Sequence, residues 1–382
     1  MEACLIKTIY IDKQFKDLKE TEKILDNFDK DVQIKITENT SEVFKIIQSS
    51  ENPILAAKEI LLLTSNKGAF VRECPGTSNY RCCGYKILHI GSFCTMDCSY
   101  CILQSYFHPP LLQFFLNHDD MIQELDDKIF NKPQISRVGT GEFTDSLIWE
   151  YWTDLPEMLI KKFADQDRAC LELKTKTVAI DFLKNIKHNQ KTIISWSMNT
   201  PGIIKSDERK TSTLDSRLKA AGKCASWGYP LAFHFDPLFI YKGWEKDYEF
   251  TINEIFRLIP WQTIAYISLG SFRFMPSLKP IIQNRFPDSK IVYGEFILGL
   301  DGKMRYYKPL RIDLYKKIVG MIKKHAPDLC LYFCMEDDDV WSEVFGFIPE
   351  APGDSISDML DKSVRNHCGL TPGPNVVEIR QS

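Results

Sequence analysis

Three cysteines, Cys94, Cys98 and Cys101, are separated by three and then two residues. A two-residue gap such as the one between Cys98 and Cys101 occurs in zinc, redox and iron sites, so that pair alone is ambiguous. Three thiolates on one short loop can hold three corners of a cubane iron–sulfur cluster and leave the fourth iron free to bind a small molecule. We therefore predict that these cysteines are metal ligands at a catalytic centre. A zinc knuckle or three buried thiols is the alternative.

Five further cysteines are candidates for a second iron–sulfur cluster. Three lie in a turn-rich segment just before the motif, and two lie in a predicted strand near the carboxyl end, where their even separation puts them on one face. These residues are Cys74, Cys82, Cys83, Cys330 and Cys334. The alternative is that they pack as small apolar side chains. Clustered cysteines in a chain without an export signal favour metal ligation over a disulfide framework.

The composition is that of an ordinary soluble globular protein. The 382 residues are 44% hydrophobic and 26% charged, which permits one large domain with additions or two domains. The net charge of −3 gives no global attraction to nucleic acid but does not exclude a local basic groove. The chain contains no apolar run long enough to cross a bilayer and no secretory signal pattern. We expect a cytoplasmic protein that does not bind membranes.

Recurring β-like segments with helical stretches between them predict an α/β fold built from parallel βαβ units. The predicted strands cover residues 86–90, 135–139, 170–175, 192–197, 231–235 and 264–269. The cysteine motif follows the first strand directly. It therefore falls at the carboxyl ends of the strands, where the loops of a parallel barrel converge and reactive groups collect.

Four parts of the chain are expected. Residues 1–84 form a small α/β lead-in with the cysteine-rich segment, including strands at 6–11 and 32–36 and a helix over 53–63. Residues 85–272 form the barrel. Residues 273–370 form an α/β extension on the substrate side, and 371–382 form a loose tail.

Polar residues follow several of the predicted strands. The candidates for ligand binding at these strand ends are Gly141, Glu142, Lys176, Ser197, Asn199 and Asp236. A cation suits a carboxylate, and hydroxyl or amide groups suit ribose hydroxyls. Glycine lets the backbone approach a ligand closely. The alternative for Glu142 is a tight turn with a solvated acid, and His234 near the end of the fifth strand is a satisfied core histidine if it faces the outer helices.

The three-then-two spacing, with aromatic Tyr100 just before the last cysteine, resembles the signature of the radical S-adenosylmethionine (SAM) enzymes. The resemblance implies a partial (β/α)6 barrel, a [4Fe–4S] cluster on the three cysteines and SAM chelated by the open iron. It further implies reductive cleavage of SAM to a 5′-deoxyadenosyl radical, with electrons from a donor such as flavodoxin or ferredoxin. In that superfamily, a Gly-Glu stretch placed like Gly141-Glu142 engages the SAM amino group.

The region from Cys94 to Tyr248 is similar to the spore photoproduct lyase family, which reverses a thymine–thymine adduct in spore DNA. The matching stretches are residues 98–104, 175–176, 196–199, 210–217, 228–231 and 240–245. By this resemblance, Lys176 and Ser197 correspond to residues that contact SAM.

Two residues depart from the lyase pattern. Glu142 stands where the lyase carries a cysteine that returns a hydrogen atom to the product radical, and Ile102 stands where it carries a relay tyrosine. We therefore expect a divergent member with an altered substrate or outcome. Cys170, Cys224 or a cysteine of residues 74–83 could supply the hydrogen atom instead.

Basic and aromatic residues alternate after the sixth strand. Such a surface can pair phosphates with cations and stack bases on rings, so we consider Arg273, Arg305, Tyr306 and Arg311 as substrate contacts. The alternative is a helix starting near Pro309 with solvated charges. The expected function is radical SAM chemistry on a nucleobase or DNA lesion. A radical SAM enzyme acting on a peptide or small metabolite, and a non-catalytic iron–sulfur or zinc-binding module, are the alternatives.

Overall fold

The computed structural model describes residues 6–76, 80–350 and 353–373. Its main feature is a curled eight-stranded sheet with the order β18-β14-β13-β11-β10-β9-β5-β4. The strands are β4 (Val71–Glu73), β5 (Lys86–Leu88), β9 (Ser136–Gly139), β10 (Ala169–Thr175), β11 (Thr192–Ser197), β13 (Leu231–Leu238), β14 (Ile264–Ser271) and β18 (Leu331–Phe333). All six predicted barrel strands are present. All neighbours from β5 to β18 pair in parallel, and only β4 pairs antiparallel.

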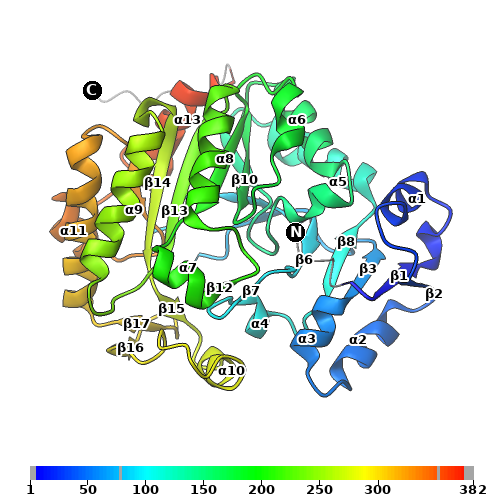
Figure 1. Ribbon diagram of the computed structural model, residues 1–382. Coiled ribbons are helices and arrows are strands. Elements are labelled where there is room, and N and C mark those ends of the chain that lie inside the picture. Colours follow the sequence, from blue (N-terminus) through cyan, green and yellow to red (C-terminus); the bar gives the residue numbers. More distant parts are fainter. Residues whose placement is uncertain (1–5, 77–79, 351–352, 374–382) are drawn as a thin grey trace.

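Helices cover the outer face of this sheet (Figure 1). They are α6 (Leu155–Ala164), α8 (Leu214–Ser226), α9 (Trp244–Leu258) and α11 (Lys308–His325). Every residue of β11 and β14 is buried, as is typical of parallel strands covered on both faces. The predicted half-barrel is thus confirmed, and it is larger than six strands because β18 extends the parallel sheet.

Helix α13 (Ile356–Cys368) closes the amino-terminal end of the half-barrel. Asp361 pairs with Arg137 at the start of β9 (2.9 Å), and Ser363 donates to the carbonyl of Ala265 at the start of β14. A capping box of Ser355 and Asp358 begins the helix. Figure 1 shows α13 at the opposite end of the main sheet from β7 (Asp97–Cys98) and α4 (Leu103–Tyr106). The carboxyl ends of the strands therefore remain as the open mouth.

The amino-terminal part contains a second sheet with the order β2-β1-β3-β8-β6. The strands are β1 (Thr8–Asp12), β2 (Gln33–Thr37), β3 (Ile60–Thr64), β6 (Gly91–Ser92) and β8 (Leu112–Phe115). The helix predicted over 53–63 is wrong in its second half, because α3 (Pro53–Glu59) ends and the chain continues as β3. The apolar run Leu61–Leu63 is fully buried between β1 and β8, which favours a central parallel strand. Since β6 and β8 follow residue 84, this sheet crosses the predicted boundary.

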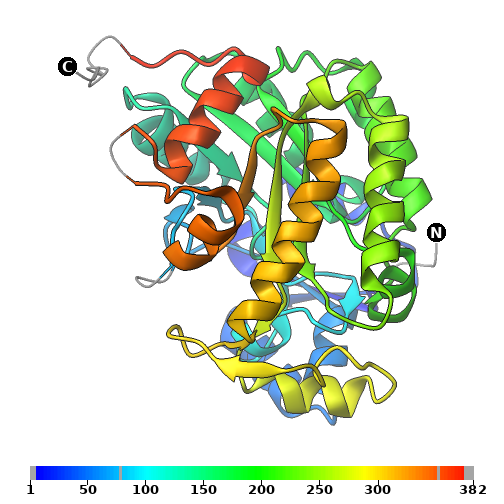
Figure 2. The same cartoon turned by 90° about the vertical axis from the view of Figure 1, so that its left-hand side faces the viewer.

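The carboxyl-terminal part adds a small antiparallel sheet, β15-β17-β16, beside α10 (Leu278–Arg285) at the mouth (Figure 2). Its strands are β15 (Arg273–Phe274), β16 (Phe296–Leu298) and β17 (Met304–Tyr306). The other short elements are α1 (Lys19–Leu25), α2 (Thr40–Gln48), α5 (His118–Leu125), α7 (Pro201–Asp207), β12 (Glu208–Arg209) and α12 (Asp338–Phe345). The tail predicted over 371–382 lies largely outside the described residues. Across residues 6–76, 80–350 and 353–373, no helix is both long and apolar enough to span a bilayer.

Candidate functional site

The three motif cysteines lie on the loop between β6 and α4, and β7 within this loop pairs antiparallel with β12. Cys98 is buried, and Cys94 and Cys101 are half-buried. Burial raises the pKa of the Cys94 thiol to about 12 and raises that of Cys98 as well. Because metals bind the thiolate, loading this loop with iron would release protons.

The donor set of this loop fits an iron–sulfur cluster. It offers three sulfur ligands and no fourth, as a cubane with one open iron requires. Within the described parts of the chain, no three His, Cys, Asp or Glu side chains converge on one point as ligands of a single metal ion would.

A buried lysine supports the loop from α3. Lys58 Nζ donates to the carbonyl oxygens of Cys94 (3.0 Å) and Met96, and it lies 3.6 Å from the Asp97 carboxylate. The side chain is only 5% exposed. A buried cation next to Cys94 favours negative charge on the sulfur, and it lowers the pKa of that thiol against the effect of burial.

Gln104 supports the loop from its other end. Its amide Nε2 donates to the carbonyl oxygens of Cys98 (3.2 Å), Ser99 (3.0 Å) and Cys101 (3.3 Å). Arg285 of α10 in turn donates to Gln104 Oε1 and lies 3.0 Å from Asp97. The backbone of the cysteine loop is therefore fixed by side chains from both the amino-terminal and the carboxyl-terminal parts of the fold.

Several of the predicted SAM-binding residues meet beside Cys98. The Tyr100 hydroxyl donates to the Glu208 carboxylate, and the Lys176 ammonium lies 5.7 Å from the centre of the Tyr100 ring. Arg217 pairs with Glu208 at 2.6 Å and donates to the carbonyl of Ser197 at 2.9 Å. The structure thus brings Tyr100, Lys176 and Ser197 together. No sequence pattern pointed to Glu208, whereas Arg217 lies in a stretch that carries the family resemblance.

Gly141 and Glu142 lie across the mouth against Lys174 of β10. A Cβ atom on Gly141 would come within 2.8 Å of the Lys174 Cβ and 3.1 Å of its carbonyl oxygen, so only glycine fits this close approach. The Glu142 carboxylate pairs with the Lys174 ammonium. Burial lowers the pKa of Lys174, but the Glu142 and Glu172 carboxylates outweigh burial and raise this pKa above its ordinary value. Lys174 is a mouth residue outside the predicted set of ligand-binding residues.

Asn199 and Asp236 already have protein partners. The amide of the buried Asn199 donates to the Pro237 carbonyl (3.0 Å) and accepts from the Tyr248 hydroxyl (3.0 Å). Asp236 forms two 3.1 Å contacts with Arg273. Both side chains therefore hold neighbouring strand ends in place.

Buried titratable side chains from different strands contact one another in the barrel interior. Glu172 of β10 contacts His234 Nε2 at 2.5 Å and accepts from the Tyr266 hydroxyl at 2.8 Å. Burial raises the pKa of Glu172, but His234 outweighs it and holds the pKa at about 2. His234 thus faces the interior and not the outer helices.

The cysteines predicted for a second cluster are divided between two ends of the barrel. Cys330 and Cys334 flank β18, and four residues along a strand correspond to about 13 Å. The Cys330 thiol lies 3.9 Å from a carbonyl of α13 at the closed end, whereas Cys334 Sγ lies 3.2 Å from Arg273 at the mouth. Their joint ligation of one cluster is not supported. The thiols of Cys74 and Cys83 lie against that of Cys82.

Three of the four predicted substrate contacts are buried. Arg305 pairs with Asp301 at 2.7 Å, and Arg311 lies 3.2 Å from Glu336. The Tyr306 hydroxyl accepts from a backbone amide inside the second hydrophobic cluster. Because these side chains are at most 3% exposed, they leave no surface for a substrate. Only Arg273 remains at the mouth.

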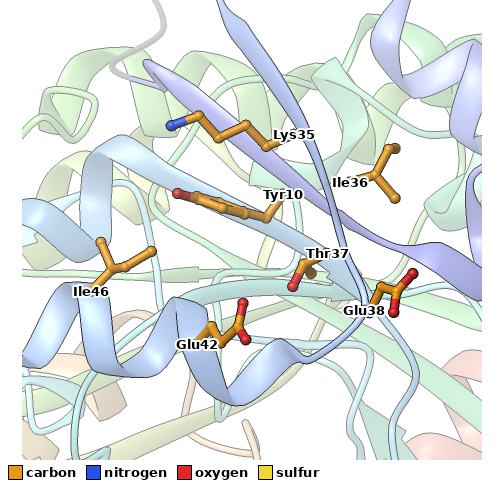
Figure 3. Close-up of a pocket in the computed structure, with 7 residues that line it drawn as sticks. All are labelled: Tyr10, Lys35, Ile36, Thr37, Glu38, Glu42 and Ile46. Atoms are coloured by element: carbon orange, nitrogen blue, oxygen red, sulfur yellow. The ribbon is translucent and has the colours of Figure 1, made fainter.

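One surface hollow lies outside this site and another lies at its border. One, of about 580 Å³, is formed by β1, β2 and α2, with Tyr10, Lys35 and Glu42 among its lining residues (Figure 3). It lies on the amino-terminal sheet and contains none of the predicted site residues. The other, also of about 580 Å³, includes Gln104 and Arg285 and so borders the cysteine loop.

Comparison with known proteins shows which family the sequence matches. A family model described as spore photoproduct lyase matches residues 5–324. The chain is 30% identical over 237 residues to the spore photoproduct lyase of Bacillus subtilis, covering 61% of this chain and 67% of that protein. It is 26% identical over 308 residues to the lyase of Clostridium acetobutylicum, covering 80% and 87%.

Solved structures share the fold. A spore photoproduct lyase complexed with dinucleoside spore photoproduct superimposes with a TM-score of 0.76 at 22% identity, covering 87% of this chain and 100% of that one. A double mutant of such a lyase, with bound AdoMet and dinucleoside spore photoproduct, gives a TM-score of 0.74 at 22% identity, covering 86% and 99%. These similarities establish the architecture around the cysteine loop.

Proposed function

The chain belongs to the spore photoproduct lyase family of radical SAM lyases, and from this premise we propose that it cleaves SAM reductively and repairs a lesion of the spore photoproduct type in DNA or a nucleotide. One observation supports this proposal above the others. The loop with Cys94, Cys98 and Cys101 lies at the mouth of the half-barrel. Its Tyr100 lies under the Lys176 ammonium and is linked to Ser197 through Glu208 and Arg217.

Each part of the site has a proposed role toward the cofactors. Cys94, Cys98 and Cys101 would hold a [4Fe–4S] cluster. When bound, the cluster and SAM supply a 5′-deoxyadenosyl radical under reduction by a donor such as flavodoxin or ferredoxin. Lys58 and Lys176 place positive charge on two sides of the loop and so favour the anionic ligands.

The strand ends would bind SAM. The Lys176 ammonium suits the SAM carboxylate, Ser197 suits a ribose hydroxyl, and the Glu142 carboxylate suits the SAM amino group. Gly141 keeps the backbone open beside Lys174. Asn199 and Asp236, whose polar atoms are already paired, would act by holding the strand ends that carry these groups.

We further propose that the chain is a divergent member. Glu142 stands where a hydrogen-donor cysteine is expected, and Ile102 stands where a relay tyrosine is expected; Ile102 is 40% exposed beside the cluster loop. A second candidate is radical SAM modification of a peptide or small metabolite. It is favoured by the burial of Arg305 and Arg311, which removes two of the cations expected to meet phosphates.

Anaerobic reconstitution tests this function. We expect about four irons per chain and dithionite-dependent formation of 5′-deoxyadenosine. Addition of dinucleoside spore photoproduct should then give the repaired dinucleoside, and Cys98→Ala should abolish both products. Cleavage of SAM without repair would favour the second candidate. A protein that binds no iron, or a cluster that never binds SAM, would refute the enzyme assignment for this chain.

A further inference from the structure

The two edges of the half-barrel meet at a seam. Strands β5 and β18 lie near opposite ends of the main sheet, yet the segment before β5 contacts the segment after β18. The Arg81 amide donates to the Glu336 carbonyl (3.1 Å), and its guanidinium forms contacts of 2.6 and 2.8 Å with Asp338. The seam therefore brings the thiols of residues 74–83 toward the loop that carries Cys334.

Cys334 lies at the mouth, where β18 ends. Its amide donates to the Leu269 carbonyl of β14 (2.9 Å), which fixes its backbone on the sheet. Its Sγ lies 3.2 Å from Arg273, whose guanidinium is held by Asp236 after β13 through two contacts of 3.1 Å. Cys334 is half-buried, so the thiol is shielded from bulk solvent without being sealed in the core.

From this position we propose that Cys334 is the hydrogen-atom donor that quenches the substrate radical. The inference rests on the proposed function, which leaves a carbon radical on the substrate. The S–H bond of Cys334 breaks and a C–H bond forms, and a thiyl radical remains on sulfur. One electron from the low-potential reductant, dithionite in the assay, and one proton from water return the thiyl radical to the thiol.

The surroundings of Cys334 keep the thiol protonated. Burial raises its pKa to about 12, with Asp236 and Glu142 adding to this effect and Arg273 opposing it. A hydrogen-atom donor must carry its S–H hydrogen, so a raised pKa suits this role, whereas a nucleophile needs the thiolate.

A buried hydroxyl without a hydrogen-bond partner also lies inside the half-barrel. The buried Tyr85 hydroxyl has no hydrogen-bond partner among the described residues. It lies over Gly139 at the end of β9, where an added Cβ would come within 1.5 Å of it, and the Glu142 charge acts on it. Buried polar groups are nearly always satisfied, so a polar group of a ligand is the expected partner at this point of the mouth.

The other candidate thiols are placed less well for this role. Cys170 is fully buried against Cys368 of α13 at the closed end. Cys224 is buried in α8, in the outer helical layer. Cys74 lies at the seam but is engaged with Cys82, whose pKa is lowered chiefly by that contact. Of these thiols and Cys334, only Cys334 both lies at the mouth and has a partner, Arg273, that orients it.

The test compares Cys334→Ala with Cys330→Ala, which removes the thiol that precedes β18 at the closed end. Each reconstituted enzyme is assayed in D2O with dithionite, SAM and dinucleoside spore photoproduct. We expect Cys334→Ala to form 5′-deoxyadenosine but to lower the yield of deuterium-labelled repaired product by at least about tenfold, and Cys330→Ala to match the wild type. Cys334→Ser, which retains a polar contact for Arg273, should behave as Cys334→Ala does.

A second readout does not depend on turnover. Anaerobic alkylation with iodoacetamide, followed by peptide mass spectrometry, reports the reactivity of each thiol. We expect dinucleoside spore photoproduct and SAM to protect Cys334 and to leave Cys330 unchanged. Normal labelled product from Cys334→Ala, or equal alkylation with and without the probe, would overturn the inference. A wild-type enzyme that forms no 5′-deoxyadenosine would instead refute the proposed function.

Discussion

The Glu208 carboxylate lies 2.6 Å from the Arg217 guanidinium, and neither side chain has more than 1% of its surface exposed. Glu208 also accepts a hydrogen bond from the Tyr100 hydroxyl, and Arg217 also donates a hydrogen bond to the Ser197 carbonyl. One ion pair thus joins the cysteine loop to the end of β11. The relative position of the cluster ligands and the proposed SAM contacts depends on this pair.

Replacing Arg217 should therefore be costly. Arg217→Ala leaves a buried carboxylate without its cation, and we expect a loss of about 3–5 kcal/mol in the free energy of unfolding. Urea denaturation measures this change. The matched control is Lys219→Ala on the same helix, because Lys219 pairs with Asp215 at 2.7 Å on the exposed face. This control should change stability by less than about 1 kcal/mol. Equal losses in the two variants would contradict the structural role of the pair.

Gly141→Ala should disturb the strand end that carries Glu142. The added Cβ comes within 2.8 Å of the Lys174 Cβ, and relief of this overlap moves the backbone. We expect a loss of about 1–3 kcal/mol in the free energy of unfolding and weaker SAM binding by calorimetry. Gly202→Ala in α7 meets no atom within 4 Å and should keep both properties. Unchanged SAM affinity in Gly141→Ala would argue against a contact at this turn.

The buried pair of Glu172 and His234 should make stability depend on pH. The pKa of Glu172 is lowered from 4.5 to about 2 in the folded state. The contribution of this group is therefore fully present above pH 4.5 and is lost as the pH falls from 4.5 toward 2. From the size of the shift, it is on the order of 3 kcal/mol. Urea denaturation of the wild type and Glu172→Gln between pH 7 and pH 3 should show the difference shrinking. A constant difference across this range would contradict the linkage.

Lys58 should matter for the cluster more than for the fold. Lys58→Met removes the donor to the Cys94 and Met96 carbonyls and a positive charge beside the Cys94 sulfur. Since such supporting contacts tune metal binding, we expect retention of iron against a chelator to weaken by about 10- to 100-fold. Visible absorbance during chelator titration checks this. Lys45→Met on the exposed face of α2 is the control and should retain iron as the wild type does.

The sequence by itself determined the local features of this protein. The spacing of Cys94, Cys98 and Cys101 predicts a cluster-binding loop, because ligand spacing is a property of neighbouring residues. The six barrel strands were predictable because their apolar segments recur between helical stretches. The same reasoning failed at Ile60–Thr64, where a short apolar run fits a helix end as well as a buried strand. Pairing with β1 and β8 makes this segment a strand.

Only the tertiary structure decided which distant residues meet. Cys330 and Cys334 flank the same short strand but lie at opposite ends of the barrel, and the difference depends on where α13 closes the sheet. Arg305 and Arg311 look like exposed cations in the sequence, yet both are buried, Arg305 against Asp301 four residues earlier and Arg311 against Glu336 of another segment. The contacts of Arg81 with Glu336 and Asp338 across the seam follow no local pattern. Such contacts arise from packing between residues far apart in the chain, and no periodicity encodes them.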